Sequence, residues 1–216
     1  MPTFMFADIA GFSALTEQHG DQDAMDLAHR YEVLVVSLLP NSAHLVKMIG
    51  DAAMIAGTDE TDCALLALRL LSAAEELPGK PALRIGMHAG EAAERAGDYW
   101  GHAVNVAARV AARAEACETL LTAVVRERIQ TDRLPPGTRM VGIGTQRVRN
   151  IAEALELFSL RVQPDDLILD PVCRMRLNAV DAHGTLRVND LTYYFCSLAC
   201  AGKFAVEPGR YISELT

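Results

Sequence analysis

The feature that most constrains the fold is an alternation of short apolar runs with longer segments of helical periodicity, which continues to about residue 162. The short runs end at turn residues, as buried strands do, and the longer segments repeat leucine or alanine at helical spacing. Predicted strands cover residues 3–9, 45–49, 52–55, 83–89, 119–123, 140–148 and 155–162, and predicted helices cover residues 13–39, 61–77 and 101–116. This order predicts an α/β (α+β) domain with a mixed sheet.

A polar segment that contains a proline, Gln163-Pro-Asp-Asp166, interrupts this pattern. We therefore expect a large domain over residues 1–162, a linker over 163–169 and a small domain over 170–216. Half of the 216 residues are hydrophobic, so the first domain can bury a sizeable core. The second domain has about fifty residues, a length that seldom folds on hydrophobic burial alone.

Charge and hydropathy exclude several classes of partner. The formal net charge of −8 argues against a nucleic acid polymer or an anionic membrane surface as a general partner. No stretch approaches the length of apolar sequence that a membrane span needs, and the N-terminus lacks the pattern of a signal peptide. The sequence therefore predicts a cytoplasmic protein.

Two aspartates follow or join predicted strands at glycine turns. Asp8 ends an apolar run and is followed by Ile-Ala-Gly-Phe-Ser, and Asp51 follows Gly50 in a predicted type II′ hairpin turn. Two carboxylates on neighbouring strand ends can share Mg²⁺ ions, an arrangement that suits in-line phosphoryl transfer. Aspartate is also common in turns without any ligand, so each residue taken alone is equally compatible with a turn former.

A third motif is the stretch "GDYWGHAVNVAAR", which begins at Gly97. On a helix that starts near Gly101, Asn105 and Arg109 are four residues apart and share one face. An amide and a guanidinium side by side suit an oxygen-rich ligand such as a nucleotide. The alternative is a solvated polar stripe on an amphipathic helix.

Together these motifs resemble class III nucleotidyl cyclases, whose domain is ferredoxin-like and dimerises head to tail. The segments that carry the resemblance are "FADIAGFS", "VKMIGDAAMI", "LRIGMHAGE", "GDYWGHAVNVAAR" and the tail "RVRNIAEALELFSL". By position, the resemblance implies that Asp8 and Asp51 bind two Mg²⁺ or Mn²⁺ ions. It implies that Lys47 and Asp98 read the adenine ring, where guanylyl cyclases usually carry Glu and Cys.

The same resemblance implies roles for three further residues. Asn105 positions the ribose, Arg109 neutralises the α-phosphate in the transition state, and Arg149 lies near a basic residue that touches the terminal phosphates in some members. The implied reaction converts ATP to 3′,5′-cyclic AMP and pyrophosphate. Each active site of a homodimer is expected to combine the two aspartates of one chain with the remaining residues of its partner. The alternative is an inactive nucleotide-binding scaffold that carries a metal-binding tail.

Three of the five cysteines lie close together in the last quarter of the chain. Cys196 and Cys200 are separated by three residues and Cys173 lies upstream, a pattern that favours a metal site over a disulfide framework. Asp170 and His183 are the candidates for a fourth ligand. A site of three thiolates would favour Cu⁺. The alternative is three reduced structural thiols.

This tail resembles the YHS domain, which is related to the TRASH metal-binding modules. The resemblance depends on "DPVCRM", on "YYFCSLAC" and on the phenylalanine and Pro-x-x-Tyr that follow. It implies a module that binds Zn²⁺ or Cu⁺ and that either senses the metal, in a regulatory role, or is stabilised by it.

Overall fold

The computed structural model describes residues 1–13, 16, 20–162, 168–172, 176–177, 179, 182–189 and 191–212. The chain divides into two compact units, Met1–Val162 and Gln163–Thr216, and each is described by itself below. In the described ranges no helix is long and apolar enough to cross a lipid bilayer.

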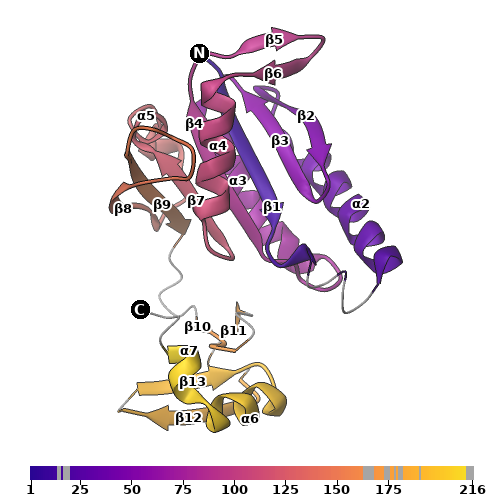
Figure 1. Cartoon of the computed structure of the whole chain (residues 1–216), viewed down its shortest axis with the longest axis vertical. Coiled ribbons are helices and arrows are strands. Elements are labelled where there is room, and N and C mark those ends of the chain that lie inside the picture. The colour runs from indigo at the N-terminus through magenta and orange to yellow at the C-terminus, as the bar shows by residue number, and fades with distance from the viewer. Residues whose placement is uncertain are drawn as a thin grey trace. The chain divides into compact units, whose positions relative to one another are not determined.

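The first unit is built on a seven-stranded sheet with the order β2-β3-β1-β4-β7-β9-β8 (Figure 1). The strands β4 and β7 pair in parallel and every other neighbouring pair is antiparallel, which confirms the predicted mixed sheet. The strands are β1 (Thr3–Ile9), β2 (Ala43–Ile49), β3 (Ala52–Gly57), β4 (Leu83–Ala89), β7 (Glu118–Thr122), β8 (Thr138–Gln146) and β9 (Leu155–Val162).

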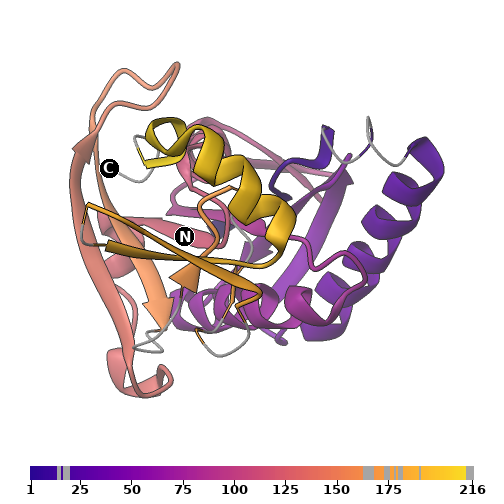
Figure 2. The same ribbon diagram turned by 90° about the horizontal axis from the view of Figure 1, so that it is seen from below.

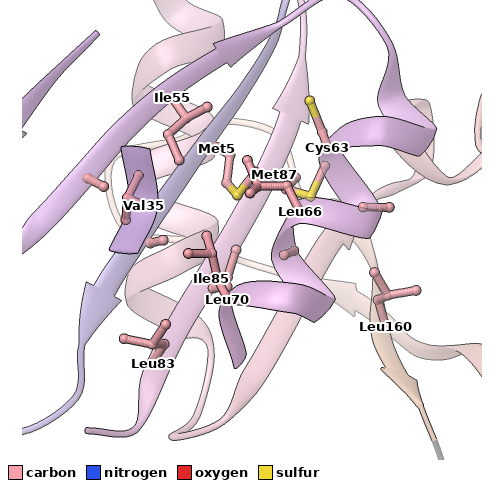
Figure 3. Packing of buried hydrophobic residues seen from close by; sticks show 14 of the residues in the cluster. Met5, Val35, Ile55, Cys63, Leu66, Leu70, Leu83, Ile85, Met87 and Leu160 are labelled. Carbon is pink, nitrogen blue, oxygen red and sulfur yellow. The ribbon is translucent and has the colours of Figure 1, made fainter. Parts of the chain in front are cut away.

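Helices cover both faces of this sheet. The helices α2 (Asp21–Leu38) and α3 (Glu60–Ala73) pack on one face, where Met5, Ile85 and Met87 of the strands meet apolar side chains of both helices (Figure 3). The helix α4 (His102–Arg113) packs on the strands in a separate cluster with Phe4 and Phe6. The sheet is therefore the middle layer of three. Short helical turns complete the unit: η1 (Ala74–Glu76), α5 (Ala123–Arg126) and η2 (Thr131–Arg133).

The contact between α4 and β4 is unusually close because β4 carries a glycine at the crossing. A Cβ atom built on Gly86 would lie 2.0 Å from the backbone N of Ala111 and 2.6 Å from the carbonyl carbon of Val110. No side chain fits in that space. The small residues Ala107 and Ala111 lie on the buried side of α4. This contact fixes the height of α4 above the sheet.

The main departure from the predicted elements is a hairpin formed by β5 (Ala93–Arg95) and β6 (Asp98–Trp100). The sequence predicts no strand here, because strands of three exposed or half-exposed residues carry no readable periodicity. The helix α4 also ends at Arg113, three residues earlier than predicted, because Ala114 takes an extended conformation.

In the second unit, the described residues form two short hairpins and two helices. The strands are β10 (Ile168–Leu169), β11 (Arg176–Leu177), β12 (Gly184–Val188) and β13 (Leu191–Phe195), and the helices are α6 (Leu198–Val206) and α7 (Pro208–Ile212). Figure 2 shows α6, in yellow, lying across the β12–β13 hairpin. Phe195 and Phe204 are fully buried, with ring centroids 5.1 Å apart. The core is small and aromatic.

Candidate functional site

The two aspartates singled out in the sequence meet at one end of β1. Asp8 lies in β1 directly opposite Ala52 on one side and Arg84 on the other. Asp51 precedes Ala52 in the two-residue turn of the β2–β3 hairpin, where Gly50 has a φ of 63° and supplies the left-handed conformation that the turn requires. The guanidinium of Arg84 forms an ion pair with the carboxylate of Asp8.

The carboxylates of Asp8 and Asp51 lie close enough for Asp8 to affect the pKa of Asp51. Burial, and then the negative charge and hydrogen bond of Asp8, raise the pKa of Asp51 to about 6, against an opposing effect from Arg84. Tyr31 of α2 lies beneath this pair, and its hydroxyl donates a 2.9 Å hydrogen bond to the carbonyl oxygen of Ala7. Burial and the charges of Asp8 and Asp51 raise the pKa of Tyr31 above its ordinary value. The site therefore concentrates negative charge.

This donor set fits a divalent cation of the Mg²⁺ or Mn²⁺ type. Carboxylate oxygens are the ligands that these hard ions prefer, and a cation placed between two neighbouring carboxylates offsets their negative charge. Arg84 supplies one positive charge at this place, but its Nε atom is buried and has no hydrogen-bond partner among the described residues. Among the described residues, the negative charge of the two aspartates is therefore only partly neutralised. The Nε–H group of Arg84 also remains free to donate a hydrogen bond to a ligand.

Lys47 and Asp98 form a second charged pair, although 51 residues separate them in the chain. The Nζ atom of Lys47 donates a 2.6 Å hydrogen bond to Oδ2 of Asp98 and lies 5.8 Å from the centre of the half-exposed Trp100 ring. The hydrogen bond from Lys47 and the backbone N–H of Tyr99 hold the pKa of Asp98 below its ordinary value. Lys47 therefore pairs with Asp98 of the β5–β6 hairpin rather than with Asp51.

The remaining predicted residues of the first unit lie on exposed surfaces. Asn105 and Arg109 share the solvent-facing side of α4, as their spacing predicted, and neither makes a side-chain hydrogen bond or ion pair within the described part of the chain. Arg149 is exposed in the connection between β8 and β9. These three side chains are available to a ligand or a second protein chain.

In the second unit, Asp170, Cys196 and Cys200 form a group whose ligand atoms all lie within 4.8 Å of one another. Asp170 is buried, and both of its carboxylate oxygens accept backbone N–H bonds, from Val172 at 2.8 Å and from Cys196 at 2.7 Å. His183, the other candidate for a fourth ligand, is exposed and does not belong to this group. Cys173 lies outside the described residues.

Arg84 is a site residue that the sequence analysis did not single out. The sequence does place this arginine between apolar residues of a predicted strand, and the structure shows that its neighbours are buried. A guanidinium in such a place needs an anionic partner, so the position itself indicates an ion pair. The partner, Asp8, could be named only once the register of β1 against β4 was known.

Comparison with known proteins bears on the family and the fold of the first unit. The model of the adenylate and guanylate cyclase catalytic domain matches residues 2–150. An adenylate cyclase of Streptomyces griseus is 36% identical over 110 residues, which cover 50% of this chain and 28% of that protein. A pH-sensitive adenylate cyclase of Mycobacterium tuberculosis is 33% identical over 159 residues, which cover 74% of this chain and 40% of that protein. The chain thus spans less than half the length of these curated relatives.

A solved structure of an adenylate cyclase from Trypanosoma brucei shares the fold, with a TM-score of 0.67 and 21% identity over 76% of this chain and 90% of that one. The family model covers more than half of the chain, and the mixed sheet is that of the solved cyclases. The chain therefore belongs to the family of adenylate and guanylate cyclase catalytic domains.

Proposed function

We propose that this chain is an adenylyl cyclase that converts ATP to 3′,5′-cyclic AMP and pyrophosphate. The observation that carries the proposal is the meeting of Asp8 and Asp51 at adjacent strand ends, where burial and mutual repulsion raise the pKa of Asp51. Two Mg²⁺ or Mn²⁺ ions held by these carboxylates would lower the pKa of the ribose 3′-hydroxyl and offset the charge of the triphosphate.

The side chains of this protein would then position the nucleotide. Lys47 and Asp98 would bind the adenine ring, and their existing hydrogen bond supports a shared pocket. Asn105 would hold the ribose, so that its 3′-oxygen faces the α-phosphorus. Arg109 would bind the non-bridging oxygens as negative charge builds during in-line attack, with Arg149 near the terminal phosphates. Exposed Asn105 and Arg109 suit a role in trans, so a homodimer would hold two shared sites.

Preference for ATP over GTP follows from the two groups that would read the base. An ammonium group can donate to the ring nitrogen N1 of adenine, which accepts, and a carboxylate can accept from its exocyclic amino group. Guanine presents the opposite pattern at these two positions, a ring N–H and a carbonyl oxygen. A buried group that is left without its partner weakens binding of the wrong base.

We further propose that the C-terminal unit is a YHS-type metal-binding module that stabilises or regulates the cyclase domain. The group of Asp170, Cys196 and Cys200 supports this role. Two thiolates and one carboxylate suit Zn²⁺ better than Cu⁺, because the oxygen ligand is hard. Participation of Cys173 would shift that preference towards Cu⁺.

The direct test is an assay of the purified chain with Mn²⁺ and either ATP or GTP, with the product identified by chromatography and mass spectrometry. We expect cyclic AMP from ATP. We expect Arg109→Ala to lower kcat about 10²- to 10³-fold with little change in ATP affinity, since the guanidinium acts mainly in the transition state. A confirmed dimer that forms no cyclic nucleotide would instead support an inactive scaffold with a metal-binding tail.

The metal proposal is tested separately by the same assay with and without added Zn²⁺ or Cu⁺. Cys196→Ser is expected to abolish metal binding and any metal response while it leaves basal activity intact. Binding of a metal by the variant with unchanged stoichiometry would contradict the assignment of Cys196 as a ligand.

A further inference from the structure

Cys196 and Cys200 are placed to react with each other as well as to bind a metal. Cys196 directly follows β13 and Cys200 lies in the first turn of α6, and their Sγ atoms are 3.7 Å apart. That distance is van der Waals contact between sulfur atoms, and the bond length of a disulfide is about 2.05 Å. Closure therefore requires a movement of less than about 2 Å, which side-chain rotation can supply.

The backbone on each side of this thiol pair is anchored. The buried carboxylate of Asp170 accepts a 2.7 Å hydrogen bond from the N–H of Cys196. The hydroxyl oxygen of Ser197, which caps α6, accepts a 3.2 Å hydrogen bond from the N–H of Cys200. These two bonds hold the cysteines at the junction of β13 and α6. They fix the backbone positions from which the two sulfur atoms come into contact.

The pair also differs from Cys63 in access to solvent. Cys196 and Cys200 are both partly exposed, so a small oxidant can reach them. Cys63 of α3 is fully buried, and burial raises its pKa to about 12, which leaves it almost entirely in the unreactive thiol form at neutral pH. Cys63 therefore provides an internal negative control.

We propose that Cys196 and Cys200 form a reversible disulfide when a hydroperoxide oxidises them. The thiolate of Cys200 would react with the peroxide in the first step. Its sulfur attacks the outer peroxide oxygen, the O–O bond breaks, and the leaving oxygen departs as water or an alcohol after taking a proton. The thiolate of Cys196 then attacks the sulfenic sulfur, the S–O bond breaks and a second water leaves. The sulfurs lose two electrons in total, and these reduce the peroxide.

This disulfide would compete with metal binding at the same place. Oxidation removes both thiolates from the group of Asp170, Cys196 and Cys200, so one chain cannot hold the ion and the disulfide together. Disulfide formation depends on neither proposed function, because it can be measured on metal-free protein without any cyclase assay.

The experiment treats reduced, metal-free full-length protein with a stoichiometric amount of hydrogen peroxide, removes the peroxide with catalase and blocks the remaining thiols with N-ethylmaleimide. Trypsin places Cys196 and Cys200 together in the peptide 188–203, Cys173 in 162–174 and Cys117 in 114–126. We expect peptide 188–203 to lose the mass of two hydrogen atoms and to lose both maleimide labels. Dithiothreitol should restore the two labels. The other cysteine peptides should be unchanged.

Two variants make the result specific. Cys173→Ser should still close the disulfide, and Cys200→Ser should leave Cys196 available to maleimide. The proposal is overturned if the peptides 162–174 and 188–203 become cross-linked, or if Cys196 and Cys200 keep their labels when Cys117 is already oxidised. Preloading with Zn²⁺ should slow closure severalfold, and an unchanged rate would show that the thiols are not the ligands of that ion.

Discussion

Arg84 supplies a positive charge beside the carboxylates of Asp8 and Asp51, and it pairs with Asp8 rather than Asp51. Asp51 therefore keeps an elevated proton affinity, with a pKa of about 6 that arises from burial and from the charge of Asp8. In an unfolded chain its carboxyl would titrate near 3.8. The difference between these values links the stability of the metal-free protein to pH.

The sign of this linkage gives the first prediction. Between pH values of about 4 and 6 the folded chain binds the proton of Asp51 more tightly than the unfolded chain, so the contribution of Asp51 to stability falls as the pH rises through that range. The variant Asp51→Asn has no titratable group at this position, so it does not lose this stability as the pH rises. We expect the variant to have a higher Tm than the parent at pH 7 in EDTA, and a smaller difference at pH 4.

Thermal unfolding of both proteins across this pH range in EDTA measures the effect, and the same scans with Mn²⁺ provide the control. The ion should raise the Tm of the parent more than that of Asp51→Asn, because the amide is a poorer ligand. A Tm difference in EDTA that is constant from pH 4 to pH 7 would show that folding does not raise the pKa of Asp51.

The pairing of Lys47 with Asp98 leads to a prediction about the choice of nucleotide. The double variant Lys47→Glu with Asp98→Cys replaces the ammonium by an acceptor, which suits the ring N–H of guanine. We expect the ratio of kcat/KM for ATP to that for GTP to fall roughly a hundredfold, as is typical when base-reading hydrogen bonds are exchanged.

Steady-state kinetics with both nucleotides measure that ratio, and Lys80→Glu is a matched charge change outside the site. Lys80 follows the turn after η1 and is exposed. An unchanged ratio in the double variant, with measurable activity, would remove Lys47 and Asp98 from base recognition.

At the scale of secondary structure, the close contact of α4 with β4 determines where Asn105 and Arg109 are presented. Those two side chains occupy the solvent-facing side of a helix whose other side is fixed by Gly86. Any increase in the distance between α4 and the sheet moves both groups outward together. The positions of Asn105 and Arg109, which would bind the ribose and the α-phosphate, therefore depend on Gly86, which lies beneath α4 and does not contact the nucleotide.

Gly86→Ala tests this dependence. The new methyl group would overlap the backbone of Ala111 and Val110, and backbone atoms cannot rotate away as a flexible side chain can. We expect a loss of stability on the order of 3 kcal/mol, as overpacking of a core produces, and a fall in kcat in the protein that remains folded. Urea unfolding and kinetics at low temperature measure the two effects.

The matched control is Gly142→Ala in β8, where the nearest atom to a new Cβ would be 3.6 Å away on the Phe158 ring. Both changes place alanine in a strand, so strand propensity is the same in the two variants. Equal loss of stability in both would mean that propensity, and not the contact with α4, explains the effect of Gly86→Ala.

Strands with buried residues could be predicted from the sequence more accurately than exposed strands. The predicted strands at 3–9, 83–89 and 155–162 have the observed bounds. Each is a stretch of strand-forming residues that includes buried side chains and contains no glycine or proline turn. The β5–β6 hairpin was missed because its short strands face solvent. That hairpin positions Asp98, so the residue was named from sequence without the element that carries it.

The site residues show the same limit. Asp8, Asp51, Lys47 and Asp98 were identified from local motifs and a family resemblance. The pairing of Lys47 with Asp98 and of Asp8 with Arg84 could not be identified in this way, because both are set by strand register over long separations. In the C-terminal unit, the spacing of the cysteines suggested a shared ion but left the oxygen or nitrogen ligand open. The burial of Asp170 beside the two thiols distinguishes it from exposed His183.

At the scale of the whole molecule, the proposed site is divided between chains, and this division can be tested without a structure of the dimer. Asp51→Asn removes a metal ligand, and Arg109→Ala removes the group that would stabilise the transition state. Each homodimer should be almost inactive because both of its sites carry the same defect. A heterodimer of the two variants should contain one site with both defects and one site with neither.

Mixing the two variants in equal amounts should therefore restore activity. Random exchange makes about half of the dimers heterodimers, and one of the two sites in each is intact, so we expect about a quarter of the parent activity. Different affinity tags on the two variants allow the heterodimer to be purified, and its activity should be about half that of the parent. If a purified heterodimer of well-folded chains stays inactive, Asp51 and Arg109 must act within one chain. The exposed position of Arg109 and the half-buried position of Asp51 would then need a different explanation, in which α4 faces a ligand held by the sheet of the same chain.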